Sequence, residues 1–326
     1  MKHVDIIYGN VEIIDNVVVD IINTAIFQRL KGIDQAGYFQ VYFPGTEHSR
    51  FDHSVGCYLL LRKFGASIEE QIAGLLHDIS HSAFSHTADY VFDGGRGADH
   101  NYQDDIFEEF VMQTEIPGIL QKYGFDVDYI LNENNFSLQE TDLPDLCADR
   151  IDYSLRGVIV YDIASKAEID SMLDNLKVVK NKWVFENFDY AQKYAQMFKK
   201  LNDVYYSNRE TAAMFSRTSN WIKYAIDKGY ITQRELFMTD NEVIKKINAH
   251  KKYDKTLDKL WEKMNNPKII LGKSEDDDTR EVVVKSRIVD PLFIDGSNMK
   301  RVSDRDHGWS EIVREDMQPK IYYLKQ

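Results

Sequence analysis

The chain has 326 residues, of which 43% are hydrophobic and 12% aromatic, and its formal net charge is −13. This composition is that of a folded globular protein and excludes a disordered chain. The acidic balance argues against extended binding to nucleic acid, because a duplex is bound through a basic face. It leaves room for small nucleotides and divalent cations, which need only a local pocket.

The two cysteines and the hydropathy pattern indicate where the protein resides. Cys57 and Cys147 each lie in an apolar helical context, which predicts two buried, reduced thiols and no disulfide framework. No stretch approaches the roughly 18 apolar residues that span a bilayer. The first residues also lack the apolar run of a signal peptide. We therefore expect a cytoplasmic protein without a membrane partner.

The first 45 residues predict short, mixed elements. Residues 1–22 hold short apolar runs broken by Gly9-Asn10 and Asp15-Asn16, which predict a small hairpin leading into a helix. Apolar residues recur at helical spacing over residues 24–36. Residues 38–44 are aromatic and β-branched, which indicates an extended segment.

Helical patterns dominate from there to about residue 265. Amphipathic periodicity predicts helices over residues 54–64, 68–77, 105–114, 119–123, 143–163, 190–217, 220–228 and 241–252. The chain then becomes rich in Val, Ile and Tyr, and strands are predicted over residues 268–271, 281–289 and 320–324. The predicted fold class is mainly α, a helical bundle with a small β-rich C-terminal lobe over residues 266–326.

Histidines cluster in one part of the chain. Six of the nine lie in a short stretch, at His48, His53, His77, His81, His86 and His100. Neutral imidazoles near carboxylates are typical of a metal site. His77 and Asp78 follow the apolar run of residues 73–76, at the predicted end of a helix. Adjacent residues project about 100° apart on a helix, so they can reach one ion beside the helix end from different sides.

Such an ion needs ligands from other helices. His53, at the start of a predicted helix, is one candidate, and Asp149, on a largely buried helix, is the best candidate acid. A buried carboxylate requires a partner or a cation. The alternative for Asp149 is a salt bridge with Arg150 or Arg156.

The order His53, His77-Asp78, Asp149 resembles that of the HD-domain metal-dependent phosphohydrolases. Longer stretches are similar to the deoxynucleoside triphosphate triphosphohydrolase branch, which includes dGTPase-like enzymes and the dNTPase with a sterile-alpha-motif domain. These stretches are FQRLKGIDQAG…YFPGTEHSRFDHSVG, IAGLLHDISHSAFSH and DRIDYSLRG, with weaker similarity in YYSNRETAAMF and KSRIVDPLF. The resemblance implies an HD core over residues 1–180, with residues 181–265 as a helical extension packed on it.

The resemblance also implies a reaction. It makes one transition-metal ion (Fe, Mn, Co, Ni or Zn) the cofactor, with Mg²⁺ on the substrate phosphates as a second cation. The implied metal ligands are His53, His77, Asp78 and Asp149. The implied activity is hydrolysis of (deoxy)nucleoside triphosphates to nucleoside plus triphosphate, by attack of metal-bound water on the α-phosphorus. The implied catalytic histidines, one of them the general acid, are His81, His86 and His100.

Other positions match family residues that contact the substrate. Arg50 and Arg150 match phosphate-contacting cations, and Arg209 is a third candidate. Gln35 matches a contact to the 3′-hydroxyl, and Tyr153 matches a residue that packs near the sugar. The implied partners are therefore a nucleotide substrate and, as in the family, further copies of the chain in a dimer or tetramer.

The sequence departs from the family where the sugar is recognised. Ala36 stands where relatives often carry a bulky residue, and Gly157 stands where many carry an aspartate that contacts the 3′-hydroxyl. Loss of such a contact weakens selection for that hydroxyl. Two alternatives stay open: an HD phosphohydrolase acting on a mono-, di- or modified nucleotide, and a nucleotide sensor with little turnover. Asn23 and Lys31 replace an aspartate and an arginine that read guanine in relatives, so we expect no such activator site.

Overall fold

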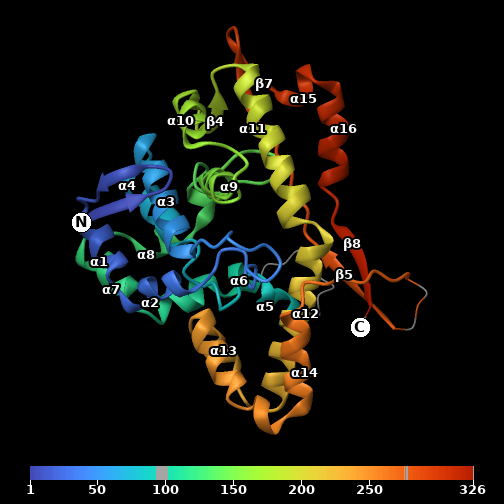
Figure 1. Ribbon diagram of the computed structural model, residues 1–326. Coiled ribbons are helices and arrows are strands. Elements are labelled where there is room, and N and C mark those ends of the chain that lie inside the picture. Colours follow the sequence, from blue (N-terminus) through green and yellow to red (C-terminus); the bar gives the residue numbers. More distant parts are fainter. Residues whose placement is uncertain (93–101, 275, 277, 326) are drawn as a thin grey trace.

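The computed structural model describes residues 1–92, 102–274, 276 and 278–325 (Figure 1). Helices dominate it, and small sheets lie at the N-terminus and in the C-terminal part. The predicted fold class, mainly α with a small β-containing C-terminal region, is confirmed. Within the described ranges, no helix has both the length and the apolar character needed to cross a bilayer.

The chain begins with the expected hairpin. β1 (Lys2–Asp5) pairs antiparallel with β2 (Gly9–Glu12), and α1 (Asn16–Ile22) follows. In place of one helix over residues 24–36, α2 (Ala25–Gln28) passes into a 3-10 turn at Arg29–Gly32. The prediction of an extended segment over residues 38–44 was wrong. Its backbone bonds locally, and its aromatic rings enter the core instead of a sheet.

Three helices form the centre of the fold. α3 (Arg50–Lys63) packs against both α4 (Ile68–Leu76) and α9 (Ala148–Val160). A Cβ on Gly56 of α3 would lie 2.1 Å from the Oδ2 atom of Asp152 on α9, so the close approach of these helices requires glycine. The helix predicted to begin at residue 143 begins at Ala148, because Cys147 has an extended backbone and caps its N-terminus.

Short helices follow α4 along the chain. They are α5 (Thr87–Phe92), α6 (Tyr102–Met112), α7 (Ile116–Lys122) and α8 (Val127–Leu131). α10 (Lys166–Asp174) follows α9 and begins with a capping box between Ser165 and Glu168. These helices place their apolar faces in the two clusters of buried side chains that surround α3.

The helix predicted over residues 190–217 is interrupted. α11 (Phe188–Leu201) passes into a π-helical turn at Asn202–Tyr206, and α12 (Arg209–Asp227) starts anew after the N-cap Asn208. The segment 220–228, predicted as a separate helix, is the end of α12. π-helical turns are rare and occur frequently at functional sites.

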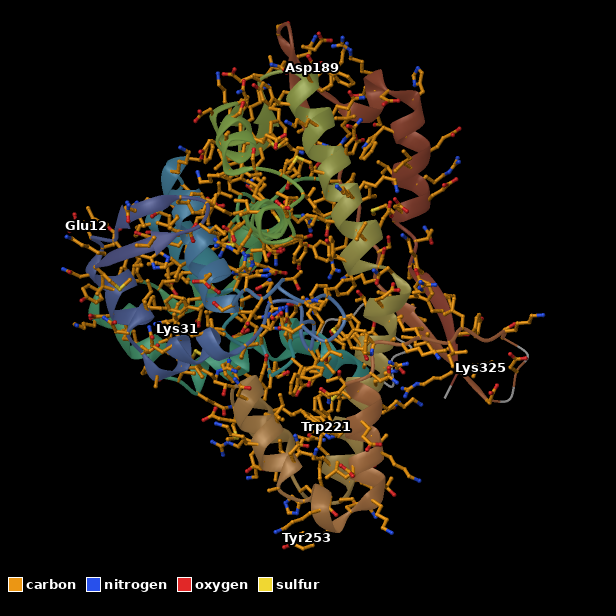
Figure 2. All side chains as sticks on the ribbon, in the orientation of Figure 1. Glu12, Lys31, Asp189, Trp221, Tyr253 and Lys325 are labelled. Carbon is orange, nitrogen blue, oxygen red and sulfur yellow. The ribbon has the colours of Figure 1, made fainter. Side chains whose placement is uncertain are left out.

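A helical lobe extends from the end of α12. It comprises α13 (Asp240–Asn248) and α14 (Lys255–Met264), which lie at the bottom of Figure 1. Trp221 is fully buried inside this lobe, and the exposed Tyr253 lies at its far end (Figure 2). The lobe has its own cluster of buried apolar side chains.

The C-terminal strands are joined to the rest of the chain. β3 (Leu176–Val179) and β4 (Lys182–Phe185) share a sheet with β6 (Leu292–Asp295) and β7 (Asn298–Arg301), in the order β3-β4-β6-β7. α15 (Val302–Arg305) and α16 (His307–Asp316) follow β7.

β5 (Thr279–Val284) pairs antiparallel with β8 (Lys320–Lys325) in a second C-terminal sheet. The strand predicted over residues 268–271 is reduced to a single bridge between Leu271 and Leu324. The strand predicted over residues 281–289 ends at Val284, because the next residues bond to Asn202.

Candidate active site

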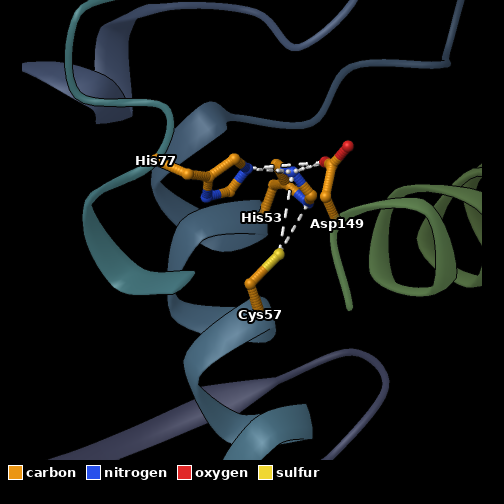
Figure 3. A group of neighbouring side chains, drawn as sticks. All are labelled: His53, Cys57, His77 and Asp149. Carbon is orange, nitrogen blue, oxygen red and sulfur yellow. Dashed lines mark hydrogen bonds and ion pairs between the residues drawn. The ribbon is translucent and has the colours of Figure 1, made fainter. Parts of the chain in front are cut away.

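Four side chains from three central elements converge. His53 lies in the first turn of α3, His77 and Asp78 directly follow α4, and Asp149 lies in the first turn of α9. The Nε2 atom of His53 lies 2.9 Å from Oδ1 of Asp149, 3.2 Å from Nε2 of His77 and 3.7 Å from Oδ2 of Asp78. Figure 3 shows the side chains of His53, His77 and Asp149 pointing toward one another.

The spacing and orientation of these atoms fit a metal ion. Ligands about 2.1 Å from one ion lie about 3.0 to 3.4 Å apart, close to the separations found here. The Nδ1 atom of His53 lies 2.9 Å from Oδ1 of Asp152, and that of His77 lies 2.8 Å from the carbonyl oxygen of Gly74. Each ring thus donates from Nδ1 and turns Nε2 to the cluster, as metal-bound histidines do. Two imidazoles with carboxylates suit one transition-metal ion.

Opposite charges stabilise each other at this cluster. Burial raises the pKa of Asp78, but the charges of Arg50 and the neighbouring histidines outweigh it and hold this pKa well below its usual range. Burial lowers the pKa of His77, and the carboxylates of Asp78 and Asp149 more than reverse this and raise it to about 10. The carboxylates are therefore ionised and favour a cation between them.

Cys57 lies one turn after His53 on α3, close to the same cluster (Figure 3). Its Sγ atom lies 3.7 Å from Nδ1 and 3.8 Å from Nε2 of His53. Such similar distances place the sulfur against the ring and away from the Nε2 lone pair. Burial raises the pKa of this thiol well above its usual value, and it donates to the carbonyl of Ala148 at 3.8 Å. Both cysteines are buried and free, as predicted.

A cavity of about 1500 Å³ opens beside the four converging residues. Most of the predicted site residues line it, namely Gln35, Arg50, His77, Asp78, His81, His86, Asp149, Arg150 and Tyr153. Further tyrosines line it as well, at Tyr161, Tyr205 and Tyr206. Arg209 does not, because it is exposed on α12 and pairs with Glu210. His100 lies outside the described residues.

The HD domain family matches residues 50–157, the segment that carries all four converging residues. The chain is also 36% identical over 252 residues to the uncharacterized protein YdhJ of Bacillus subtilis, with 77% of this chain and 76% of YdhJ covered. The chain belongs to the HD-domain family of metal-dependent phosphohydrolases.

Other relatives of this HD-domain protein carry functional names. It is 28% identical over 243 residues to the metal-dependent phosphohydrolase cns2 of Cordyceps militaris, with 73% of this chain and 70% of cns2 covered. It is 27% identical over 268 residues to the Dictyostelium discoideum homolog of deoxynucleoside triphosphate triphosphohydrolase SAMHD1, covering 76% of this chain and 45% of that protein. The fold is that of a phosphohydrolase from Bacteroides thetaiotaomicron, with a TM-score of 0.72, 18% identity and coverage of 100% and 99%.

Two histidines of the HD-domain protein lie beside the four converging residues. His81 is buried, and its Nε2 atom lies 3.1 Å from Oδ1 of Asp78. His86 meets the His81 ring edge to face, with the ring centroids 5.1 Å apart, and its Nδ1 atom lies 3.4 Å from Oδ2 of Asp89. The sequence reasoning missed Asp89. Its spacing of three residues from His86 is the signal in the sequence that points to it, and the structure places it in the first turn of α5.

The arginines at the HD site are held by specific acceptors. Arg50 donates to Oδ2 of Asp78 at 2.6 Å, to Oγ of Ser85 at 2.7 Å and to the carbonyl of Gln35 at 3.0 Å. Arg150 donates to Oε1 of Glu140 at 3.0 Å. The salt bridge between Asp149 and an arginine, the alternative that the sequence left open, is not among the contacts of the described residues. Asp149 contacts the two histidines instead.

Proposed function

We propose that this HD-domain protein hydrolyses nucleoside triphosphates, deoxynucleoside triphosphates foremost, to nucleoside plus triphosphate. The observation that carries the proposal is the cavity of about 1500 Å³. It joins three of the four converging residues, all but the fully buried His53, to the cavity tyrosines Tyr161, Tyr205 and Tyr206. Pockets for drug-sized ligands measure roughly 300 to 1,000 Å³, so a whole nucleotide has room here. The SAMHD1 homolog of Dictyostelium discoideum supports the same substrate class.

The residues of the metal site have distinct roles in this proposal. His53, His77, Asp78 and Asp149 would hold the ion, which when bound activates a water molecule and polarises the phosphorus. Asp152 and the carbonyl of Gly74 keep the two rings in the tautomer that presents Nε2. Arg50 keeps Asp78 ionised and oriented.

His86 is the proposed proton donor to the leaving oxygen. It lies at the cavity and is oriented by Asp89, whereas His81 is buried against Asp78. Burial lowers the pKa of His86, and the hydrogen bond with Asp89 opposes this change. An anionic substrate beside the ring favours its protonated form. Substrate binding thus stabilises the imidazolium form of His86, which takes its proton from solvent and donates it in general acid catalysis.

Two cavity residues are candidates for the sugar. The Oε1 atom of Gln35 and the hydroxyl of Tyr153 are buried and have no hydrogen-bond partner within the described part of the chain. Both residues line the cavity. Because a buried polar group without a partner is costly, each is a natural contact for a sugar hydroxyl.

A second candidate substrate is a nucleoside mono- or diphosphate. The observation that favours it lies at Gly157, where a Cβ atom would meet the hydroxyl of Tyr206 at 2.9 Å. A carboxylate at this position, which would select the 3′-hydroxyl of the sugar, would have to displace the Tyr206 side chain. The sugar end of the cavity therefore lacks one contact on which strict selection of a deoxynucleoside triphosphate could depend, and this opens the site to other nucleotides.

Product analysis tests the proposal. Purified protein with Mn²⁺ or Co²⁺ is given each nucleoside and deoxynucleoside triphosphate, and the products are separated by ion exchange. Nucleoside plus intact triphosphate is expected. Release of orthophosphate or pyrophosphate contradicts it, and tight binding without turnover favours a sensor. His77→Ala with Asp78→Ala should remove both metal and turnover, whereas Arg314→Gln, on the exposed face of α16, should keep both.

A further inference from the structure

The residues after β5 bring the C-terminal region into the cavity. β5 packs on α12 (Figure 1), and the Tyr90 hydroxyl on α5 donates to the carbonyl of Val283 at 2.7 Å. Lys285 and Arg287, directly after β5, line the cavity together with the HD residues. Part of the cavity lining thus comes from residues that lie more than a hundred positions later in the chain than the segment 50–157, which the HD domain family matches.

One buried side chain fixes this segment. The Nδ2 atom of Asn202 donates to Oγ of Ser286 at 2.9 Å, and its Oδ1 atom accepts from the backbone N–H of Arg287 at 3.0 Å. Asn202 is fully buried and is the first residue of the π-helical turn that ends with Tyr205 and Tyr206, both of which line the cavity. The side-chain amide of Asn202 therefore fixes the position of Arg287 relative to Tyr205 and Tyr206.

Arg287 has no counter-charge among the described residues. The residue is half-buried, and no hydrogen bond or ion pair joins its guanidinium to the side chains of the described ranges, whereas Arg50 and Arg150 each bind a carboxylate. Burial is the main cause that lowers the pKa of His86, and the charges of Arg50 and then Arg287 lower it further, so Arg287 acts at electrostatic range of that ring. A partly desolvated charge favours an anionic ligand.

We propose that Arg287 binds the oxygens of the substrate's phosphate chain and that Asn202 is the residue that positions it. A planar guanidinium presents donors in a fork that matches phosphate oxygens. The inference rests on the proposed nucleotide substrate, but it requires only that the ligand carries phosphates. It also gives the C-terminal region a role in forming the site.

Binding of tripolyphosphate and of deoxyguanosine, each alone, tests the proposal without turnover. Titration calorimetry on Mn²⁺-loaded protein should show that Arg287→Gln weakens tripolyphosphate binding by about ten- to a hundredfold and leaves deoxyguanosine binding unchanged. Arg287→Lys should retain part of the affinity because the charge remains. Arg314→Gln is the matched control, since it removes an exposed arginine of the same C-terminal region. Unchanged tripolyphosphate affinity in Arg287→Gln, or weaker deoxyguanosine binding instead, overturns the proposal.

A double-variant comparison tests the role of Asn202. Asn202→Ala should weaken tripolyphosphate binding, and the double variant with Arg287→Gln should bind it no more weakly than Arg287→Gln alone, because Asn202 acts through Arg287. A further loss in the double variant would mean that Asn202 supports the fold only. If Asn202→Ala does not fold, Ser286→Ala removes one of the two bonds and is expected to show the same non-additive pattern.

The experiment separates this proposal from the proposed function. Wild-type protein that hydrolyses no triphosphate but binds tripolyphosphate through Arg287 contradicts the reaction and supports the inference. Release of nucleoside and triphosphate at wild-type KM by Arg287→Gln supports the reaction and contradicts the inference.

Discussion

The Nδ1 atom of His53 lies 2.9 Å from Oδ1 of Asp152, and this pair decides which ring nitrogen faces the proposed metal ligands His77 and Asp149. Asp152 is itself held, because its carboxylate also accepts from Nε of Arg156 at 3.0 Å and from the Tyr8 hydroxyl at 3.1 Å. Arg156 in turn binds Asp5 at 3.1 Å. A buried network from the N-terminal hairpin to α9 therefore orients one proposed metal ligand.

Asp152→Asn should lower metal affinity by about ten- to a hundredfold, the usual cost of losing a carboxylate that orients a metal-bound histidine. An asparagine amide can donate to Nδ1 and so favour the wrong tautomer of His53. Metal content after dialysis at fixed free Mn²⁺ measures the effect. Asp5→Asn is the control, since it changes another carboxylate beside Arg156 and leaves the partner of His53 in place. Equal metal loss in both variants would contradict the specific role of Asp152.

Separate substitutions of Cys57 and of Asp78 show which of the two residues is the fourth ligand of the metal ion. Cys57→Ala should keep the bound metal and lower the free energy of unfolding by about 1 kcal/mol, through the small cavity that it leaves. Asp78→Asn should lose the metal, because it removes the carboxylate next to both histidines. Metal analysis and urea unfolding of both variants measure these effects. Loss of metal from Cys57→Ala alone would reverse the assignment.

Gly157 and Tyr206 should be energetically coupled. Gly157→Ala brings a methyl group to 2.9 Å from the Tyr206 hydroxyl and should cost about 1 to 3 kcal/mol of stability, as overpacking does. Tyr206→Phe removes that oxygen and should recover most of the loss in the double variant. The coupling is read from urea unfolding of the two single variants and the double variant. Strictly additive effects would show that the two side chains do not compete for space.

The convergence of the proposed metal ligands was predictable because each lies in a short local pattern. His53 precedes an apolar helix face, His77-Asp78 ends one, and Asp149 begins another, so the sequence alone named the set that the fold brings together. Arg287 has no such pattern. Its place at the cavity depends on Asn202, 85 residues earlier, and no local periodicity encodes that contact.

The expectations that differ from the structure do so for the same reason. Arg209 was chosen for its local match, but the π-helical turn resets the register of α12 and leaves this side chain exposed beside Glu210. The aromatic run over residues 38–44 has the composition of a strand, yet tertiary packing of Phe39 and Tyr42 in the core outweighs that preference. Local propensity is decisive only where no such packing competes with it.

Two buried carboxyls, Asp34 and Asp240, should make stability depend on pH. The Oδ2 atom of Asp240 accepts from the backbone N–H of Asp34 at 3.0 Å, and its Oδ1 atom accepts from that of Phe84 at 2.7 Å. Burial raises the pKa of both carboxyls to about 7, and the charge of Asp240 contributes to the change at Asp34. Unfolded, both have pKa values near 4.

Because these pKa values are higher in the folded state, the protonated carboxyls contribute stability that is fully present below about pH 4 and is lost as the pH rises through about 7. Asp34→Asn stays neutral, so its stability relative to wild type should increase between pH 5 and pH 7 by at most about 1.4 kcal/mol per pH unit. Urea unfolding of both proteins at pH 5, 6, 7 and 8 measures the difference. Asp189→Asn, at an exposed position on α11, is the control and should show no such increase. A difference between Asp34→Asn and wild type that stays constant with pH would mean that Asp34 is ionised in the folded protein throughout this range.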